Sequence, residues 1–316
     1  MTPFTPRPTS PIHLATFGGV FLLLAISLTL TAAGLSRGTN STWPQAYAVQ
    51  RDDAAGVLTL RTPYYTVEHD LRKGGAIRRI SLTHGRAANL LVSPVETRVR
   101  VDQGAPHTDV NDPAPQVGLR RDGLSEIVTV DSALIGPQRD QPAARVLSTY
   151  TYHWGYVRIR RELLPPDEGF RVLELCPLAT VLTPSLSAYG YREGTTEEEA
   201  APPFSFGSNR WGKMRRGEPA DRPLRTPFVP RSMMFVDPGV EGLEWFVSSD
   251  LAQWDLQLTG RRGQGMCTLE LRENPDGLAL SIAPYASTNV PVTLTNRCTF
   301  DFYLAVPLLE GHALNP

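Results

Sequence analysis

Lysine is scarce in this sequence. Lys73 and Lys213 are the only two lysines, and arginine supplies the other basic side chains. The charges nearly cancel, with a formal net charge of -1 over 316 residues. Proteins that bind nucleic acid usually carry a basic excess, so this balance argues against a nucleic-acid partner. The preference for arginine indicates a GC-rich, bacterial genome more than it indicates a function.

Cysteine is also rare. The three cysteines are Cys176, Cys267 and Cys298, and their spacing matches no zinc motif. An odd number in an exported protein leaves one thiol unpaired. Cys267 and Cys298 each lie in a strand-like pattern near the C-terminus, so they are the preferred disulfide pair. Three buried, unpaired thiols are the alternative.

Amphipathic helical patterns are missing after residue 40. Strict alternation of polar and apolar residues takes their place at Thr97–Val101, Tyr156–Arg160 and Thr299–Leu304. Such alternation is typical of strands with one face in a core and one in water, and the whole chain offers about sixteen of them. That number is too large for one open sheet. The pattern therefore predicts an all-β protein, a large antiparallel β-sandwich of two facing sheets.

The one long hydrophobic run lies near the N-terminus. Residues 14–35 carry no charge, and a run of this length can span a bilayer. Small residues at Thr31-Ala32-Ala33 would also suit signal-peptide cleavage. Residues 1–36 are therefore predicted to be either a cleaved signal peptide or a retained single-pass membrane anchor. In both cases the rest of the chain lies outside the cytoplasm: in the periplasm, at the cell surface or secreted.

The remaining chain divides into a linker, 37–50, and a sandwich domain, 51–316. A long interruption at about 185–231 contains many prolines and glycines, and also the aromatic residues Tyr189, Tyr191 and Trp211. Long loops inside compact domains are often functional, and these aromatics argue against disorder. We expect this loop to take part in binding.

Several short stretches resemble a known family. The segment 57–91 contains a strand, then Gly74-Gly75, a second strand and a His84-Gly85 turn. This order resembles the opening of galactose-mutarotase-like β-supersandwich domains. The stretch Glu241–Phe246 with Trp254, and the stretch Phe302–Pro307, resemble β-sandwich domains that precede the catalytic domain of some bacterial glycoside hydrolases.

The resemblance implies a supersandwich fold and a carbohydrate ligand. It transfers no catalytic residues, because none of the six histidines lies in the Asn-His-x-Tyr type of motif that aldose epimerases use. The nine residues that follow Pro307 in this sequence are too few for a catalytic barrel. The aromatic and basic residues expected to contact sugar are Tyr189, Tyr191, Trp211, Trp245, Trp254 and Arg158.

Three further sets of residues are weaker candidates for a catalytic or metal-binding role. His153 lies among tyrosines and arginines and could move a proton. Glu241 and Glu244 could act as the carboxylates of glycoside hydrolysis. Asp109, Asn111 and Asp112 offer closely spaced oxygens that could bind calcium. For each set, a structural role is the alternative, and no other cofactor is predicted.

The leading hypothesis is an extracytoplasmic accessory protein that binds poly- or oligosaccharide. The first alternative is a glycan-active enzyme, an epimerase, lyase or hydrolase, with His153 and a carboxylate in its cleft. The second is a structural protein of the cell envelope that holds a protein partner. The membrane is a further partner if the N-terminal segment is retained.

Overall fold

The computed structural model describes residues 47–137, 142–192, 212–215, 224–226, 232–247 and 266–306. The predicted signal peptide or anchor, residues 1–36, lies outside these ranges. Within them, no helix is long and apolar enough to cross a membrane.

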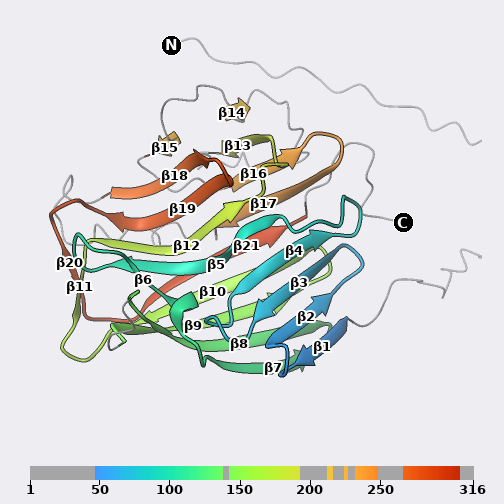
Figure 1. Ribbon diagram of the computed structural model, residues 1–316. Coiled ribbons are helices and arrows are strands. Elements are labelled where there is room, and N and C mark those ends of the chain that lie inside the picture. The colour runs from blue at the N-terminus through green and yellow to red at the C-terminus, as the bar shows by residue number, and fades with distance from the viewer. Residues whose placement is uncertain are drawn as a thin grey trace, which may run out of the picture. The chain divides into compact units, whose positions relative to one another are not determined.

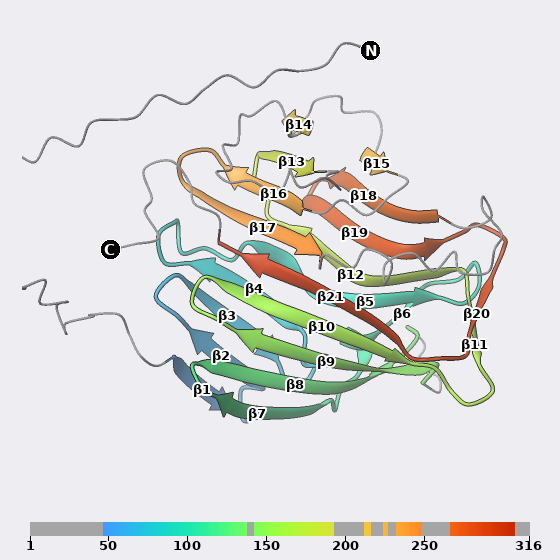
Figure 2. The same cartoon turned by 180° about the vertical axis from the view of Figure 1, so that it is seen from behind.

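Two large antiparallel sheets face each other (Figures 1 and 2). The first sheet has ten strands, in the order β1 (Ala48–Asp52), β2 (Val57–Arg61), β3 (Tyr65–Asp70), β4 (Ile77–Leu82), β5 (Leu91–Arg100), β12 (Glu174–Leu182), β19 (Gly277–Ala286), β18 (Met266–Asn274) and β15 (Leu224–Thr226), with β6 (His107–Thr108) paired to β5.

The second sheet has nine strands, in the order β14 (Gly212–Arg215), β13 (Ala188–Arg192), β16 (Ser232–Asp237), β17 (Glu241–Val247), β21 (Cys298–Ala305), β10 (Tyr156–Leu164), β9 (Ala144–Tyr152), β8 (Ser125–Leu134) and β7 (Gln116–Asp122). A small ribbon joins β11 (Phe170–Val172) to β20 (Val292–Leu294). The predicted all-β, two-sheet antiparallel sandwich is confirmed.

Alternation explains most of these strands. In β9, every second residue from Ala144 to Tyr152 is buried, and the residues between them are partly or fully exposed. A strand with this pattern gains burial only when its apolar face meets another sheet. The alternating segments at Tyr156–Arg160 and Thr299–Leu304 lie in β10 and β21, as predicted.

The predicted loop at 185–231 is only partly a loop. It contains β13, β14 and β15, and β13 pairs with β16 in the second sheet. Many prolines and glycines lie between these short strands, which is why the composition indicated a continuous loop. The first strand also starts earlier than predicted, because β1 begins at Ala48, inside the predicted linker.

The Gly74-Gly75 turn joins β3 to β4 against a short 3-10 helix, η1 (Asp109–Asn111). Both glycines have positive φ, +63° and +59°, a region that glycine enters at little cost. A Cβ on Gly74 would clash with the backbone carbonyl of Asp109, and the Gly74 amide donates to the Asp112 carbonyl at 2.8 Å. The turn therefore holds η1 against the first sheet.

A buried ion pair crosses the core. Arg161 of β10 occupies an apolar position of the strand alternation and is fully buried. One guanidinium nitrogen is 2.7 Å from Asp109 and also donates to the Thr97 hydroxyl; the other donates to the Val95 carbonyl at 2.9 Å. The Thr97 amide in turn donates to Asp109 at 2.9 Å. The pair therefore links the second sheet to β5 and η1.

His69 forms a second buried polar contact between the sheets. Its Nδ1 lies 2.7 Å from the Gly75 carbonyl, its Nε2 meets the Tyr152 hydroxyl, and its ring packs edge-on against Tyr150. Burial lowers the pKa of His69 to about 4. The ring is therefore neutral at pH 7, with Nδ1 donating to the carbonyl and Nε2 accepting from the tyrosine.

Replacing Arg161 with Ala is expected to destabilise the protein by about 3–5 kcal/mol, because Asp109 would remain buried without its counterion. Urea unfolding of the full chain measures this. The matched control is Arg145→Ala, which removes an exposed arginine paired with Asp131 and should cost less than about 1 kcal/mol. Equal losses in the two variants would contradict a structural role for the buried pair.

His69 predicts a loss of stability in acid. Its pKa is about 4 in the folded protein and about 6.5 in an unfolded chain. The stabilisation is complete above pH 6.5 and is lost as the pH falls toward 4, by about 3 kcal/mol in total. The measurement is the difference between the urea-unfolding profiles of wild type and His69→Gln across this range. Parallel profiles would show that His69 is not neutral in the core.

Candidate functional site

An open groove of about 350 Å³ lies on the outer face of the first sheet, over β5, β12, β19 and β18. Strand alternation builds it: Val95, Thr97 and Val99 point into the core, which turns Glu96 and Arg98 outward. The polar side chains that line the groove are Ser93, Glu96, Arg98, Thr180, Glu270, Arg272, Asn274 and Ser281.

The floor of the groove is irregular. The pairing of β5 with β12 shifts register on both sides of Ala179 and again after Val181. At the shift, the Ser93 hydroxyl accepts from the Val181 amide at 2.8 Å, and the Thr180 hydroxyl donates to the Ser93 carbonyl at 2.9 Å. Such bulges change the direction of side chains and often lie beside binding sites.

Glu96 is a strongly perturbed carboxyl of the groove. Burial and the nearby Asp109 carboxylate raise the pKa of Glu96 to about 7, against the opposing effect of the Arg98 guanidinium. Near neutral pH this carboxyl can therefore either donate or accept a hydrogen bond. A strongly shifted carboxyl in a concave site is a typical feature of functional sites.

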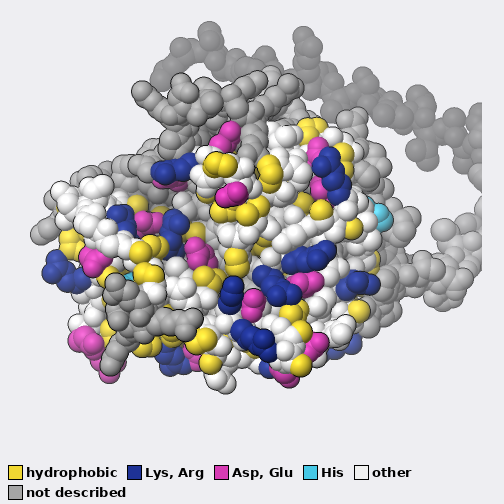
Figure 3. Space-filling model, viewed as in Figure 1, with side chains coloured by type: hydrophobic (Ala, Val, Ile, Leu, Met, Phe, Trp, Pro, Cys, Tyr) yellow, Lys and Arg dark blue, Asp and Glu magenta, His cyan; other side chains and the backbone are white. Residues whose placement is uncertain are grey.

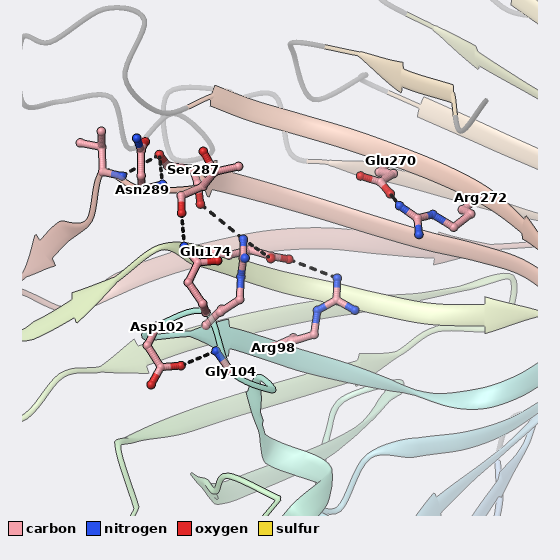
Figure 4. A network of polar contacts seen from close by, with 12 residues as sticks. Arg98, Asp102, Gly104, Glu174, Glu270, Arg272, Ser287 and Asn289 are labelled. Carbon is pink, nitrogen blue, oxygen red and sulfur yellow. Dashed lines mark hydrogen bonds and ion pairs between the residues drawn. The ribbon is translucent and has the colours of Figure 1, made fainter.

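Ion pairs hold the arginines of the groove in place (Figure 4). Arg98 lies 3.2 Å from Glu174, which also pairs with Arg100 at 3.3 Å. On the far side of the groove, Arg272 lies 2.8 Å from Glu270. Each guanidinium is thus fixed by a carboxylate while its remaining N–H groups stay able to donate. Basic and acidic side chains are interspersed over this face (Figure 3).

His153 does not lie in the groove. It occupies the turn between β9 and β10, where its ring stacks on Tyr156 with centroids 4.4 Å apart and Nδ1 lies 3.3 Å from the Ser125 hydroxyl. Burial lowers the pKa of His153 below its ordinary value, and the charge of Arg158 lowers it further. Arg158 belongs to the second sheet, where its guanidinium forms an ion pair with Asp301 at 3.0 Å.

Three predicted site residues are buried in β17. Trp245 is 1% exposed and packs against Phe302, so it is a core residue and not a sugar-stacking surface. Glu241 is 1% exposed and accepts from the Arg86 amide at 3.1 Å, and Glu244 accepts from the Ser232 hydroxyl at 2.5 Å. These acids hold local structure, which makes them poor candidates for glycoside chemistry.

The remaining aromatic candidates cannot be placed in a site. The side chains of Tyr189 and Tyr191, on β13, and the residues Trp211 and Trp254 lie outside the part of the chain described.

The acidic segment at Asp109 has a structural role. Asp109 pairs with Arg161, and the Asn111 amide donates to the Ile135 carbonyl at 2.8 Å. Asp112 accepts from the Ala114 amide at 2.9 Å and from the Ala133 amide at 2.8 Å. Within the described ranges, no three His, Cys, Asp or Glu side chains gather as a metal site would require.

The predicted Cys267–Cys298 disulfide is not formed. Cys298 is a free thiol in β21 of the second sheet, and Cys267 belongs to β18 of the first. Cys176 is also free; it is buried, donates to the Leu178 carbonyl at 3.1 Å, and burial raises its pKa to about 12.

The sequence pattern alone does not identify the groove residues. The alternation at Thr97–Val101 identified the strand that carries Arg98, but it could not show which strands lie beside it. Glu270 and Arg272 come from a strand about 170 residues away in the chain. The available signal was the sequence Glu96-Thr97-Arg98, which puts two opposite charges on one face of a strand.

Comparison with solved structures identifies the fold. A galactose mutarotase-like protein from Lactobacillus casei has a TM-score of 0.51 at 8% identity, over 79% of this chain and 100% of that chain. A TPR-domain containing protein from Parabacteroides distasonis has a TM-score of 0.50 at 9% identity, over 82% of this chain and 48% of that one.

A galactose mutarotase-like protein from Clostridium acetobutylicum has a TM-score of 0.46 at 8% identity, over 83% of this chain and 97% of that chain. The sequence itself matches no family model and no curated protein. The match to the Lactobacillus casei structure, at a TM-score of 0.51, supports the galactose-mutarotase-like fold that the sequence predicted, and at 8% identity the likeness concerns the fold alone.

The pKa of Glu96 can be measured directly. We expect its carboxyl carbon to titrate by NMR with a midpoint near 7. Arg98→Gln should raise that midpoint, because it removes the positive charge that favours the ionised form. Arg272→Gln is the control and should leave it unchanged. A wild-type midpoint near the ordinary glutamate value would refute the perturbed site.

Proposed function

We propose that this protein is an exported bacterial accessory protein that binds oligo- or polysaccharide in the groove over β5, β12, β19 and β18. The observation that carries the proposal is the groove itself, an open concavity lined by hydroxyl, amide, carboxyl and guanidinium groups. A saccharide presents many hydroxyls, each a donor and an acceptor, and a lining of this kind can satisfy both.

The electrostatics of the groove support a neutral, hydroxyl-rich ligand. Arg98 and Arg272 already have carboxylate partners, so a ligand need not supply a negative charge. Their remaining N–H groups can donate to sugar oxygens. The Glu96 carboxyl can donate when protonated and accept when ionised, and the hydroxyls of Ser93, Thr180 and Ser281 supply weaker contacts.

The fold is consistent with this ligand class. The structure from Lactobacillus casei with the same fold carries the description galactose mutarotase-like. That likeness is an analogy of fold and does not place a sugar in this groove. The groove residues themselves support the site. The location outside the cytoplasm rests on the apolar segment at residues 14–35.

Glu96 favours one alternative, a glycan-active enzyme. A carboxyl with a pKa of about 7 is suited to transfer a proton to or from a sugar oxygen at neutral pH. The two functions separate with Glu96→Gln, which keeps the shape and a hydrogen-bond donor. In both cases the variant should keep its affinity for the glycan, so turnover separates the two functions. If Glu96 transfers a proton, the wild type turns the glycan over and the variant does not. If the groove only binds, neither protein shows turnover.

Binding can be tested with the full chain on a glycan array, followed by calorimetry with the best ligand. Arg272→Ala is expected to weaken binding about tenfold, the size of one lost hydrogen bond to a charged group. Arg272 is exposed, so this variant should fold normally.

Arg145→Ala is the matched control, because it removes an equally exposed, ion-paired arginine on the second sheet. Binding to no glycan at high protein concentration, or equal weakening in the two variants, would refute the proposed site.

A further inference from the structure

One end of the sandwich is formed by turns of both sheets. We call it the turn end. It contains the β2–β3, β7–β8 and β9–β10 turns, which are joined by contacts. The Thr62 hydroxyl donates to the Trp154 carbonyl at 3.1 Å, and the Ser125 hydroxyl lies 3.3 Å from His153 Nδ1. Figure 2 shows the β9–β10 turn and the start of β1 at this same end.

The turn end exposes large apolar side chains. Leu124, in the β7–β8 turn, is 65% exposed, and Tyr156, which follows the β9–β10 turn, is 38% exposed. Leu119, on the edge strand β7, is 41% exposed. Tyr156 stacks on His153 and lies 6.3 Å from Tyr303, so an aromatic row continues from the turn onto the second sheet. Tyrosines of this kind are typical of the interface between membrane and water.

The described chain begins at this end. Ala48 pairs with Arg61, which places Tyr47 beside the β2–β3 turn. Burial raises the pKa of Tyr47 to about 12; Glu126 and Tyr156 raise it further, and the charge of Arg121 opposes the shift. Tyr47 therefore lies close to the β7–β8 hairpin and the start of β10.

The link to the apolar segment is short. Only residues 36–46 separate that segment from Tyr47. A fully extended chain covers at most about 3.6 Å per residue, so this link reaches no further than about 40 Å. If residues 14–35 remain in a bilayer, this link keeps the turn end within that distance of the segment.

We propose that the turn end docks on a lipid bilayer surface, with Leu124 and Tyr156 entering the headgroup region. Arg61 is an exposed basic side chain on the same end and suits a lipid phosphate, and Arg121, also exposed there, pairs with Glu126 at 3.7 Å. The proposal depends on a retained N-terminal anchor and not on the glycan-binding groove, which occupies the outer face of the first sheet. The two proposals can therefore fail separately.

Photo-cross-linking of the full chain in vesicles tests the docking. A photoreactive amino acid is placed at Leu124, or at Ala55 in the β1–β2 turn at the opposite end, or at Val92. Val92 is an exposed apolar residue, 49% accessible, on β5 in the middle of the first sheet. All three positions are exposed, so the probe should not disturb folding. The vesicles contain phosphatidylcholine, alone or mixed with phosphatidylglycerol.

Lipid adducts are expected to be several-fold more abundant at position 124 than at 55 or 92, and to increase with phosphatidylglycerol. Equal labelling at the three positions would overturn the proposal. So would a protein adduct at 124, without lipid adducts, in native membranes, since this would identify a protein-binding surface. A mature N-terminus just after Ala33 would overturn it as well, because the anchor would then be absent.

Discussion

The buried ion pair between Arg161 and Asp109 links the two sheets and affects both the position and the pKa of Glu96 on the outer face of the first sheet. The arginine belongs to the second sheet, and its partners lie on η1 and β5 of the first. Thr97, which binds both members of the pair, is the neighbour of Glu96 in the chain. The contact on the inner face of β5 thus fixes the position from which Glu96 points into the groove. Asp109 also acts on Glu96 through its charge, and raises its pKa.

The sequence predicted the fold well where burial is one-sided. β9 and β10 alternate between buried and exposed residues because one face of each lies in the core. Prediction failed where strands lack that contrast: β13 to β15 are short segments among prolines and glycines, in a region predicted to be one long loop. Arg161 shows the limit of the pattern. An arginine at an apolar position is a signal of a buried polar contact, but its partner on η1 lies 52 residues away.

The site was harder to predict than the fold, for two physical reasons. Aromatic residues favour sugar contacts, yet a tryptophan on a strand gains most by entering the core, as Trp245 does. The alternation also breaks at turns, so His153 lies at the end of a hairpin and not on a strand face. The groove is instead built from charged side chains on strands that are distant in sequence. Their common site depends on sheet order, which a single sequence does not contain.

We propose that a saccharide occupies the groove on the outer face of the first sheet. The most direct measurement is a crystal structure of the full chain with the oligosaccharide that binds most tightly. Sugar density over the β5–β12 bulge, with hydroxyls within hydrogen-bond distance of Glu96, Arg98 and Arg272, is the predicted result. Density confined to the second sheet, for example along the aromatic row of Tyr156 and Tyr303, would contradict it.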